Sequence, residues 1–314
     1  MIPVIFPIEG LSLTDPERQL IRTWDPYGFI LFNRPGRKNI DTPDQVRALT
    51  DDIRAACGRA DCPILIDQEG GRVARMGPPH WPSFLPYEHY GQMYTSDPEE
   101  ARRALASDTA GIARLLNDAG INVNCAPVMD LHYPGAHDII GNRSFGADPG
   151  MVADLADVVC RTYLDHGITP VIKHAPGHGR ALADSHLDLP RVDVPYDELV
   201  VTDFRPFTLL SQKPYASRVW MMTAHILYPE LDPVYPATLS PNIIHNVIRK
   251  EIGFPGTIIG DDLYMKALDP YGDVPARAAA SLAAGCDLAL DCFGAVHDLE
   301  KVAQAVSKMV KTLA

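Results

Sequence analysis

The sequence predicts an α/β protein built as a single (β/α)8 barrel of the TIM type. Eight short runs rich in Val and Ile recur along the 314 residues, and a segment with helical periodicity follows each of them. This alternation of strand and helix indicates a parallel sheet. Strands that are apolar throughout are buried on both faces, which favours a closed barrel, and we expect one domain over residues 1–314.

The strands are expected in the apolar runs at 4–8, 28–32, 63–67, 121–125, 170–174, 219–225, 257–261 and 287–290. A doubly wound open sheet is the structural alternative. The first strand is followed by Pro7-Ile8-Glu9-Gly10, which is not the glycine-rich turn of a dinucleotide-binding sheet. The closed barrel is therefore the favoured architecture.

The predicted helices carry clear start signals and apolar faces. Four of them begin with a capping side chain followed by proline, a residue favoured at the first helical position. These pairs are Thr42-Pro43, Asp97-Pro98, Asp148-Pro149 and Ser240-Pro241. The helix after Ser240 gathers five aliphatic residues on one face and ends at Gly253, where a C-terminal cap glycine is expected. Each helix therefore has a face with which to cover the sheet.

Composition excludes several classes of protein. With 46% hydrophobic and 22% charged residues, the chain is neither disordered nor fibrous. The 28 Lys and Arg against 40 Asp and Glu give a formal net charge of -12, so we expect no nucleic-acid or membrane partner. The first ten residues lack a basic signal segment, so a cytoplasmic location is expected. The six cysteines form no CxxC pair and are expected to be buried thiols.

Ionisable residues gather where the predicted strands end, which is where (β/α)8 barrels carry their chemistry. Asp261 closes the seventh strand directly after Gly260, a position suited to a nucleophile directed into a pocket. Asp262 is the alternative, and one of the two is expected to cap the following helix. The local sequence favours neither of them.

The segment KHAPGHGRALADSH at 173–186 is rich in histidine and glycine. Asp184 and His186 stand two residues apart, so in an extended segment they point the same way, and the carboxylate raises the imidazole pKa towards an acid/base role. One alternative is that the three histidines are solvated loop residues. Another is that they bind a metal, although their spacing fits no zinc signature.

The loops after the third and fourth strands add further charged groups. Asp67 can accept two hydrogen bonds from sugar hydroxyls, and its alternative role is an ion pair with Arg72. Arg143 can clamp a carboxylate or hydroxyl groups, and its alternative role is a surface ion pair.

These residues together resemble the bacterial β-N-acetylglucosaminidases of glycoside hydrolase family 3, in their NagZ-type subgroup. The shared motifs follow the order of the family over most of the chain. They are IDQEGGRVAR at 66–75, CAPVMDL at 125–131, IGNRSFG at 140–146, KHAPGHG with DSH at 173–186, MTAHILYPELD at 222–232, PATLSP at 236–241 and DDLYM at 261–265. Three positions depart from the common pattern: Gly260 replaces Ser, Ala175 an aromatic residue and Asn142 Glu.

The resemblance implies a retaining cytoplasmic β-N-acetylhexosaminidase that removes terminal N-acetylglucosamine from cell-wall fragments during peptidoglycan recycling. It implies Asp261 as nucleophile, His186 as acid/base and Asp184 as the partner of His186. The residues that it implies for sugar binding are Asp67, Arg75, Arg143, Lys173 and His174. We expect a carbohydrate substrate, no cofactor or metal, and a monomer or homodimer.

Three other functions stay open on the sequence alone. They are a metallohydrolase that uses His174, His178 and His186, a noncatalytic sugar-binding barrel and a glucosidase. The complete set of catalytic candidates argues against the binding protein, and the KHAPGHG and DSH motifs argue against the glucosidase. Phosphate also stays open beside water as the acceptor, because a neutral imidazole repels an anion less than a carboxylate does.

Overall fold

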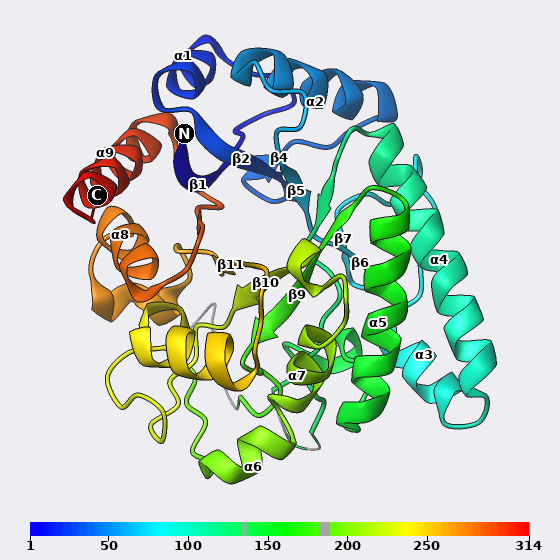
Figure 1. Cartoon of the computed structure of the whole chain (residues 1–314). Helices are drawn as coiled ribbons and strands as arrows, with labels where there is room; N and C mark the ends of the chain where they lie inside the picture. Colours follow the sequence, from blue (N-terminus) through cyan, green and yellow to red (C-terminus); the bar gives the residue numbers. More distant parts are fainter. Residues whose placement is uncertain (134, 136, 182–188, 314) are drawn as a thin grey trace.

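The computed structural model describes residues 1–133, 135, 137–181 and 189–313. Parallel strands form its centre, and helices surround them (Figure 1). The barrel strands are β1 (Ile2–Pro7), β2 (Pro26–Leu31), β5 (Ile64–Ile66), β8 (Val123–Asn124), β9 (Thr169–Ala175), β10 (Trp220–Thr223), β11 (Thr257–Gly260) and β12 (Ala289–Leu290). All eight predicted strands are present, most of them shorter than expected.

The sheet closes through contact between its two end strands. Neighbouring strands pair in parallel in the order β11-β10-β9-β8-β5-β2-β1-β12. A further parallel bridge joins Ile259 to Leu288, and the Gly260 N–H donates to the Leu288 carbonyl at 3.0 Å. The predicted (β/α)8 barrel is confirmed, and the open-sheet alternative is wrong.

A helix follows each barrel strand. The α-helices are α1 (Asp15–Trp24), α2 (Pro43–Cys57), α3 (Tyr87–Tyr94), α4 (Pro98–Asp118), α5 (Pro149–Asp165), α6 (Tyr196–Val201), α7 (Arg205–Ser211), α8 (Val274–Ala284) and α9 (Val296–Leu313). The π-helix η4 (Ile243–Glu251) stands between β10 and β11. The 3-10 helices are η1 (Gly141–Arg143), η2 (Ala216–Arg218), η3 (Ala237–Leu239) and η5 (Lys266–Tyr271).

The predicted helix starts are confirmed by their capping bonds. Thr42 Oγ1 accepts from the Gln45 backbone N–H at 3.3 Å. The Asp97 and Asp148 carboxylates accept in the same way at 3.0 and 2.6 Å. Ser240 Oγ accepts from the Ile243 N–H at 3.1 Å, although the helix beyond it has the wider i to i+5 hydrogen bonding.

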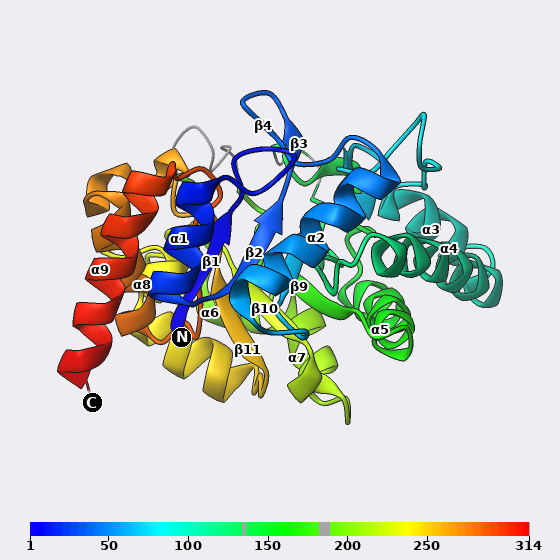
Figure 2. The ribbon, with the colours of Figure 1, turned by 90° about the horizontal axis from the view of Figure 1, so that it is seen from above.

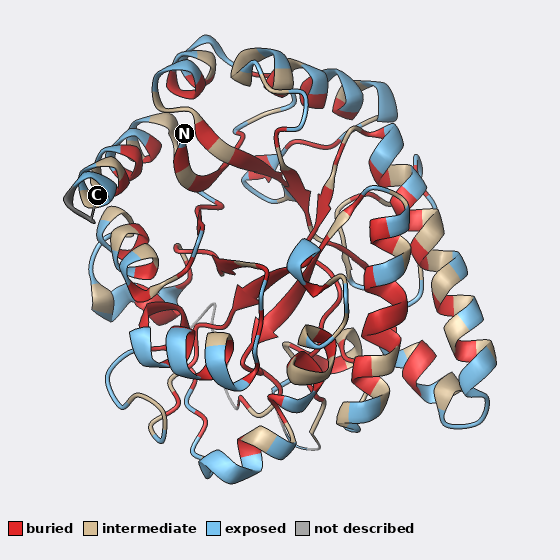
Figure 3. Cartoon of the chain, in the orientation of Figure 1, coloured by how far each residue is buried: buried red, intermediate tan, exposed pale blue. Residues whose placement is uncertain are grey.

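Alternate residues of the same strands fill two apolar layers. On β5, Leu65 packs inside the barrel, whereas Ile64 and Ile66 pack outwards against the helices. The strands are accordingly buried along their length, and the outer faces of the helices are exposed (Figure 3).

The cysteines are all free, and each is buried except Cys57, which is partly exposed. Among the described residues, no helix is long and apolar enough to cross a membrane.

Loops and short hairpins cover the face at which the barrel strands end. The hairpin of β3 (Asn33–Arg34) and β4 (Arg37–Lys38) rises from this face, and both chain termini lie towards the opposite one (Figure 2). A second hairpin, of β6 (Gln68–Gly70) and β7 (Val73–Ala74), follows β5.

Helix α3 packs closely against the segment that follows η1. The rings of Tyr87 and Phe145 lie 4.5 Å apart. A Cβ built on Gly91 would stand 1.6 Å from the Phe145 carbonyl oxygen, so a side chain at this position requires the backbone to move. The contact fixes the segment that directly follows Arg143, the last residue of η1.

We expect Gly91→Ala to lower the free energy of unfolding by more than about 2 kcal/mol, because the methyl group overlaps a backbone carbonyl. Helix propensity alone would make the same change stabilising by about 1 kcal/mol. Urea denaturation measures the difference. Gly10→Ala, where a Cβ has nothing within 4 Å, is the control and should change stability by less than about 1 kcal/mol. Equal effects of the two substitutions would contradict the close packing.

Candidate active site

A pocket of about 350 Å³ opens where the barrel strands end. Its wall includes six residues predicted to be catalytic or sugar-binding, which are Asp67, Arg75, Arg143, Lys173, His174 and Asp261. Asp262, the alternative to Asp261, and Arg72 also line it. The other two predicted catalytic residues, Asp184 and His186, lie outside the described residues.

Strand alternation explains why three of these side chains face the pocket. Leu65 and Ile259 point into the barrel, and side chains two residues apart on a strand share a face. Asp67 therefore points inwards beyond the end of β5, as Asp261 does beyond β11. Lys173 follows the same rule on β9, so the barrel itself brings together residues that are distant in sequence.

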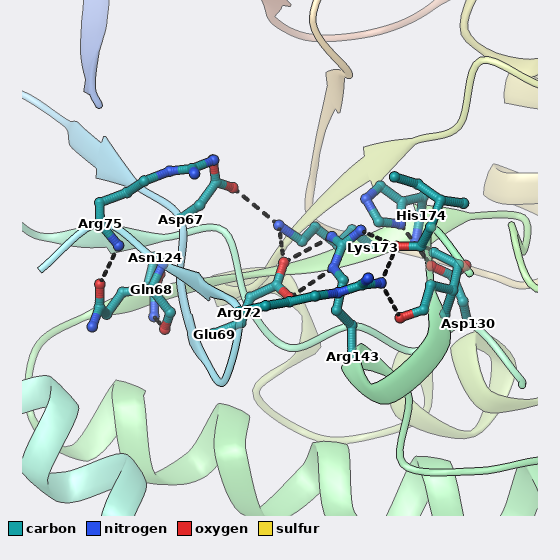
Figure 4. Close-up of polar contacts among 12 residues, drawn as sticks. Asp67, Gln68, Glu69, Arg72, Arg75, Asn124, Asp130, Arg143, Lys173 and His174 are labelled. Atoms are coloured by element: carbon teal, nitrogen blue, oxygen red, sulfur yellow. Dashed lines mark hydrogen bonds and ion pairs between the residues drawn. The ribbon is translucent and has the colours of Figure 1, made fainter. Parts of the chain in front are cut away.

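A chain of alternating charges forms one wall of the pocket. Lys173 Nζ lies 3.0 Å from Asp67 Oδ1 and 2.7 Å from Glu69 Oε1. Arg143 binds Glu69 through two hydrogen bonds of 2.9 and 2.8 Å, and Arg75 Nη2 reaches Asp67 Oδ2 at 3.0 Å. Figure 4 shows Lys173 between the two carboxylates, with Arg143 on the far side of Glu69. We call Arg75, Asp67, Lys173, Glu69 and Arg143 the charge chain.

The ionised forms of Asp67, Glu69 and Lys173 are favoured by their neighbours. Burial alone would raise the pKa of Asp67, but Lys173 and Arg75 hold it well below its usual range. Burial likewise opposes ionisation of Glu69, yet Arg143 and Lys173 lower its pKa to about 2. For Lys173, burial lowers the pKa and the two carboxylates raise it above the usual value. These three shifts all favour the charged forms of Asp67, Glu69 and Lys173 at neutral pH.

His174 is oriented by a buried carboxylate that the sequence analysis did not assign. Its Nδ1 lies 2.6 Å from Asp130 Oδ2. The same carboxylate accepts from the backbone N–H groups of His174 and His178, at 3.1 and 2.6 Å. Burial raises the pKa of Asp130, but the two histidines lower it below its usual value. The contact to Nδ1 leaves Nε2 of His174 as the ring nitrogen available to a ligand.

Glu69 and Asp130 are the functional candidates that sequence reasoning missed. Both stand inside motifs that resemble the family, DQEGGR and CAPVMD, but neither directly ends a strand. Asp130 comes six residues after the end of β8 at Asn124. The strand-end rule therefore could not select it.

Two of the alternative roles considered for the loop residues are wrong. Arg72 pairs with Asp138 at 3.3 Å and donates to the carbonyl of Ile139 at 2.9 Å, so it is not the partner of Asp67. The Arg143 side chain is 11% exposed and its partner Glu69 is 1% exposed, so theirs is not a surface ion pair.

The described part of the loop after β9 is held by close contacts. His178 is buried, and burial lowers its pKa to about 4. A Cβ on Gly179 would lie 1.7 Å from the Leu131 carbonyl oxygen. Arg180 binds Asp203 at 2.7 Å. The solvated-loop alternative is wrong for His174 and His178.

In the described ranges, no three His, Cys, Asp or Glu side chains are grouped as a metal site requires. His186, the third member of the metal alternative, is not part of these ranges.

Asp261 and Asp262 have different surroundings. The Asp262 side chain is buried and accepts from the backbone N–H groups of Tyr264 and Cys292, at 3.2 and 3.1 Å. Burial raises its pKa to about 7. The expected helix cap is wrong. The Asp262 carboxylate accepts from the Tyr264 N–H within a turn, and the next α-helix, α8, is capped by Asp273. Both residues line the pocket, and Asp261 is the more exposed carboxylate of the two.

Comparison with known proteins shows the relatives of this chain. The family described as "Glycosyl hydrolase family 3 N terminal domain" matches residues 13–313. The β-hexosaminidase of Alkalilimnicola ehrlichii is 39% identical over 292 residues, which are 92% of this chain and 80% of that protein. The β-hexosaminidase of Bordetella avium is 36% identical with the same coverage of both proteins.

Solved structures show the same likeness. NagZ from Neisseria gonorrhoeae, in complex with N-trifluoroacetyl-D-glucosamine, is 33% identical with a TM-score of 0.83 and covers 98% of this chain and 89% of its own. A glycoside hydrolase family 3 β-N-acetylglucosaminidase from Paenibacillus sp. is 30% identical with a TM-score of 0.86 over 99% of this chain. This chain spans 57% of that longer protein.

Glu69→Gln should lower the free energy of unfolding by about 3–5 kcal/mol, because it leaves the buried Lys173 and Arg143 cations without their shared carboxylate. Urea denaturation measures the change. Glu100→Gln removes the same charge from an exposed pair with Arg103 and should cost less than about 1 kcal/mol. Similar losses in the two variants would contradict a structural role for the charge chain.

Asp262→Asn should flatten the dependence of stability on pH. The pKa of Asp262 is about 7 in the folded protein and 3.8 ordinarily, so its protonated form stabilises the fold fully below about pH 4. That contribution, at most about 4 kcal/mol, is lost as the pH rises through 7. Thermal unfolding from pH 5 to 8 should therefore show that the stability of Asp262→Asn rises relative to that of the wild type as the pH increases. The control Asp118→Asn, at an exposed position, should show the same pH dependence as the wild type. Parallel profiles for wild type and Asp262→Asn would contradict this role.

Proposed function

Since this chain belongs to glycosyl hydrolase family 3 and is a β-N-acetylhexosaminidase, we propose that it removes terminal β-linked N-acetylglucosamine with retention of configuration. The proposed substrates are N-acetylglucosaminyl-1,6-anhydro-N-acetylmuramic acid fragments, with or without peptide. The proposed setting is peptidoglycan recycling in the cytoplasm.

The observation that carries the proposal is the convergence of Asp261 with the charge chain in one pocket. A space of about 350 Å³ lies near the lower end of the range for small-ligand sites, which suits a single sugar residue. The Neisseria NagZ binds N-trifluoroacetyl-D-glucosamine, which supports an N-acylated glucosamine as the sugar in the pocket.

The charge chain and His174 supply the groups for sugar recognition. Asp67 is kept ionised by Lys173 and Arg75, so its oxygens accept strongly from sugar hydroxyls. Lys173, Arg143 and the available Nε2 of His174 present donors or acceptors to the remaining polar groups. These groups hold the sugar ring in place, so that its anomeric carbon comes to the Asp261 carboxylate.

The proposed reaction has two steps. Asp261 attacks the anomeric carbon while His186, as imidazolium, protonates the departing glycosidic oxygen, and a covalent glycosyl-enzyme forms. The neutral His186 then takes a proton from water, which attacks the anomeric carbon and releases the sugar with its configuration retained. Asp184 stabilises the charged form of His186 and orients its ring.

The first test is release of 4-nitrophenol from its β-N-acetylglucosaminide. We expect Asp261→Ala to lower kcat at least about 10³-fold, because it removes the nucleophile, and His186→Ala to lower it about 10²–10⁴-fold. Asp118→Ala, at an exposed position on α4, should keep wild-type activity, and the β-glucoside should be a poor substrate. A fully active Asp261→Ala variant would exclude the mechanism.

A slow 5-fluoro sugar fluoride tests the covalent step directly. The wild type should gain the mass of one sugar residue, and peptide mapping should place it on Asp261. A wild type that turns over the nitrophenyl substrate without any trapped adduct on Asp261 would argue for direct displacement by water.

A further inference from the structure

We propose that Cys57 and Cys62 form a peroxide-reactive dithiol, a modification site at the opposite end of the barrel from the pocket. The site takes hydrogen peroxide or a small alkyl hydroperoxide as its oxidant, and it is converted to a disulfide between the two residues. This inference goes beyond the proposed function and does not depend on it, because neither cysteine lines the pocket.

A tight turn brings the two thiols together. Cys57 is the last residue of α2, and Gly58 caps the helix in the left-handed region with a φ of 67°. The Cys62 N–H donates to the Arg59 carbonyl at 3.4 Å, and β5 begins two residues later at Ile64. The Cys62 thiol donates to Cys57 Sγ, with 3.7 Å between the sulfur atoms. The two sulfur atoms therefore need only a small approach to form a bond.

The turn is held at the end of the barrel where the strands begin. Arg59 Nη1 donates to the carbonyl of Tyr27, which is the second residue of β2, at 3.2 Å. Arg59 also pairs with Asp25 at 3.3 Å and reaches Met1 Sδ at 3.4 Å. The pocket opens where the strands end, so the thiol pair and the pocket lie at opposite ends of the barrel. The pair is therefore a separate site.

The two thiols differ in access and in acidity. Cys57 is partly exposed, whereas Cys62 is fully buried. The hydrogen bond from Cys62, together with the positive charge of Arg59, holds the pKa of the Cys57 thiol below its usual value, although burial opposes this. The same hydrogen bond, together with burial, raises the pKa of Cys62 well above its usual value. Because the thiolate is the nucleophile, Cys57 reacts first and Cys62 stays a protonated neighbour.

The remaining cysteines lack this arrangement and serve as internal references. They are Cys125, Cys160, Cys286 and Cys292, and all four are buried. Burial raises the pKa of each of these thiols. Among the described residues, which include every cysteine of the chain, only Cys57 and Cys62 have thiols in contact with each other.

The proposed reaction has two steps and consumes one peroxide. The Cys57 thiolate attacks a peroxide oxygen, so an S–O bond forms, the O–O bond breaks, and the departing oxygen takes a proton from solvent. The Cys62 sulfur then attacks the sulfur of this sulfenic acid. An S–S bond forms, the S–O bond breaks, and hydroxide leaves with the Cys62 proton as water. The two sulfur atoms together lose two electrons, which the peroxide gains.

The neighbouring thiol keeps the oxidation reversible. An isolated sulfenic acid is oxidised further to sulfinic acid, which small thiols do not reduce, whereas a disulfide is reduced by thiol exchange. The contact between Cys62 and Cys57 therefore suits the pair to repeated oxidation and reduction.

The experiment treats the reduced full-length protein with a small excess of hydrogen peroxide. N-Ethylmaleimide is then added in denaturant, and the intact mass gives the number of free thiols. The reduced wild type should take up six maleimides and the oxidised wild type two fewer. Trypsin cuts after Arg59, between the two cysteines, so the disulfide should join the peptides of residues 55–59 and 60–72. Dithiothreitol should restore all six thiols.

Single substitutions test the two roles. Cys62→Ser should leave Cys57 as a sulfenic acid that dimedone traps, and a larger excess of peroxide should carry it to sulfinic acid. Cys57→Ser should keep all its remaining thiols free, because Cys62 is buried. The matched control Cys286→Ser removes a buried thiol outside the pair and should still form the disulfide between Cys57 and Cys62. Circular dichroism checks that the three variants are folded.

Three results would overturn the proposal. The first is a wild type that keeps six free thiols after treatment, and the second is oxidation at another cysteine in preference to Cys57. The third is a wild type in which Cys57 stops at the sulfenic acid, since Cys62 then does not resolve it. The wild-type result alone decides the matter if Cys62→Ser fails to fold. No sugar substrate is used, so failure of this site leaves the proposed glycosidase reaction untouched.

Discussion

The buried charge chain is the interaction on which the site depends. Glu69 and Lys173 are almost fully removed from water, with side chains 1% and 3% exposed. Charges in such surroundings are stable only when their partners stand at hydrogen-bond distance. The chain also ties together β6, β9 and η1, which are distant in sequence. It therefore sets both the shape of the pocket wall and the ionised state of Asp67.

The barrel makes this arrangement possible through a simple periodicity. Inward-facing apolar residues fill the barrel, and the next inward position on several strands carries an ionisable group instead. The supporting contacts come from the surrounding loops and helices. Asp130 orients His174, and α3 packs against the segment after Arg143 without room for a side chain at Gly91. The polar groups of the pocket are thus held on a rigid frame.

The charged residues near the pocket differ in burial and in their partners, and these differences suit them to different roles. Asp67 is held ionised by two cations, which suits the recognition of neutral hydroxyls. Asp262 also lines the pocket, but it is buried and its pKa is raised to about 7, whereas Asp261 is the more exposed carboxylate, as the proposed nucleophile requires. Arg34 is stacked on the rings of Phe32 and Phe293 and donates to the Cys292 carbonyl.

The sequence by itself determined the barrel, because strand alternation, helix caps and strand-end positions depend on residues close together in the chain. It also selected Asp67, Lys173 and the pair Asp261 and Asp262 by their place at strand ends, whereas only the resemblance to the family favoured Asp261 within that pair. Only the tertiary structure decided which partners these groups have. Glu69 binds Arg143 across 74 residues and Arg34 meets Cys292 across 258, and no local period encodes such pairings. Partner choice among several nearby charges follows from how the barrel closes and which side chains it removes from water.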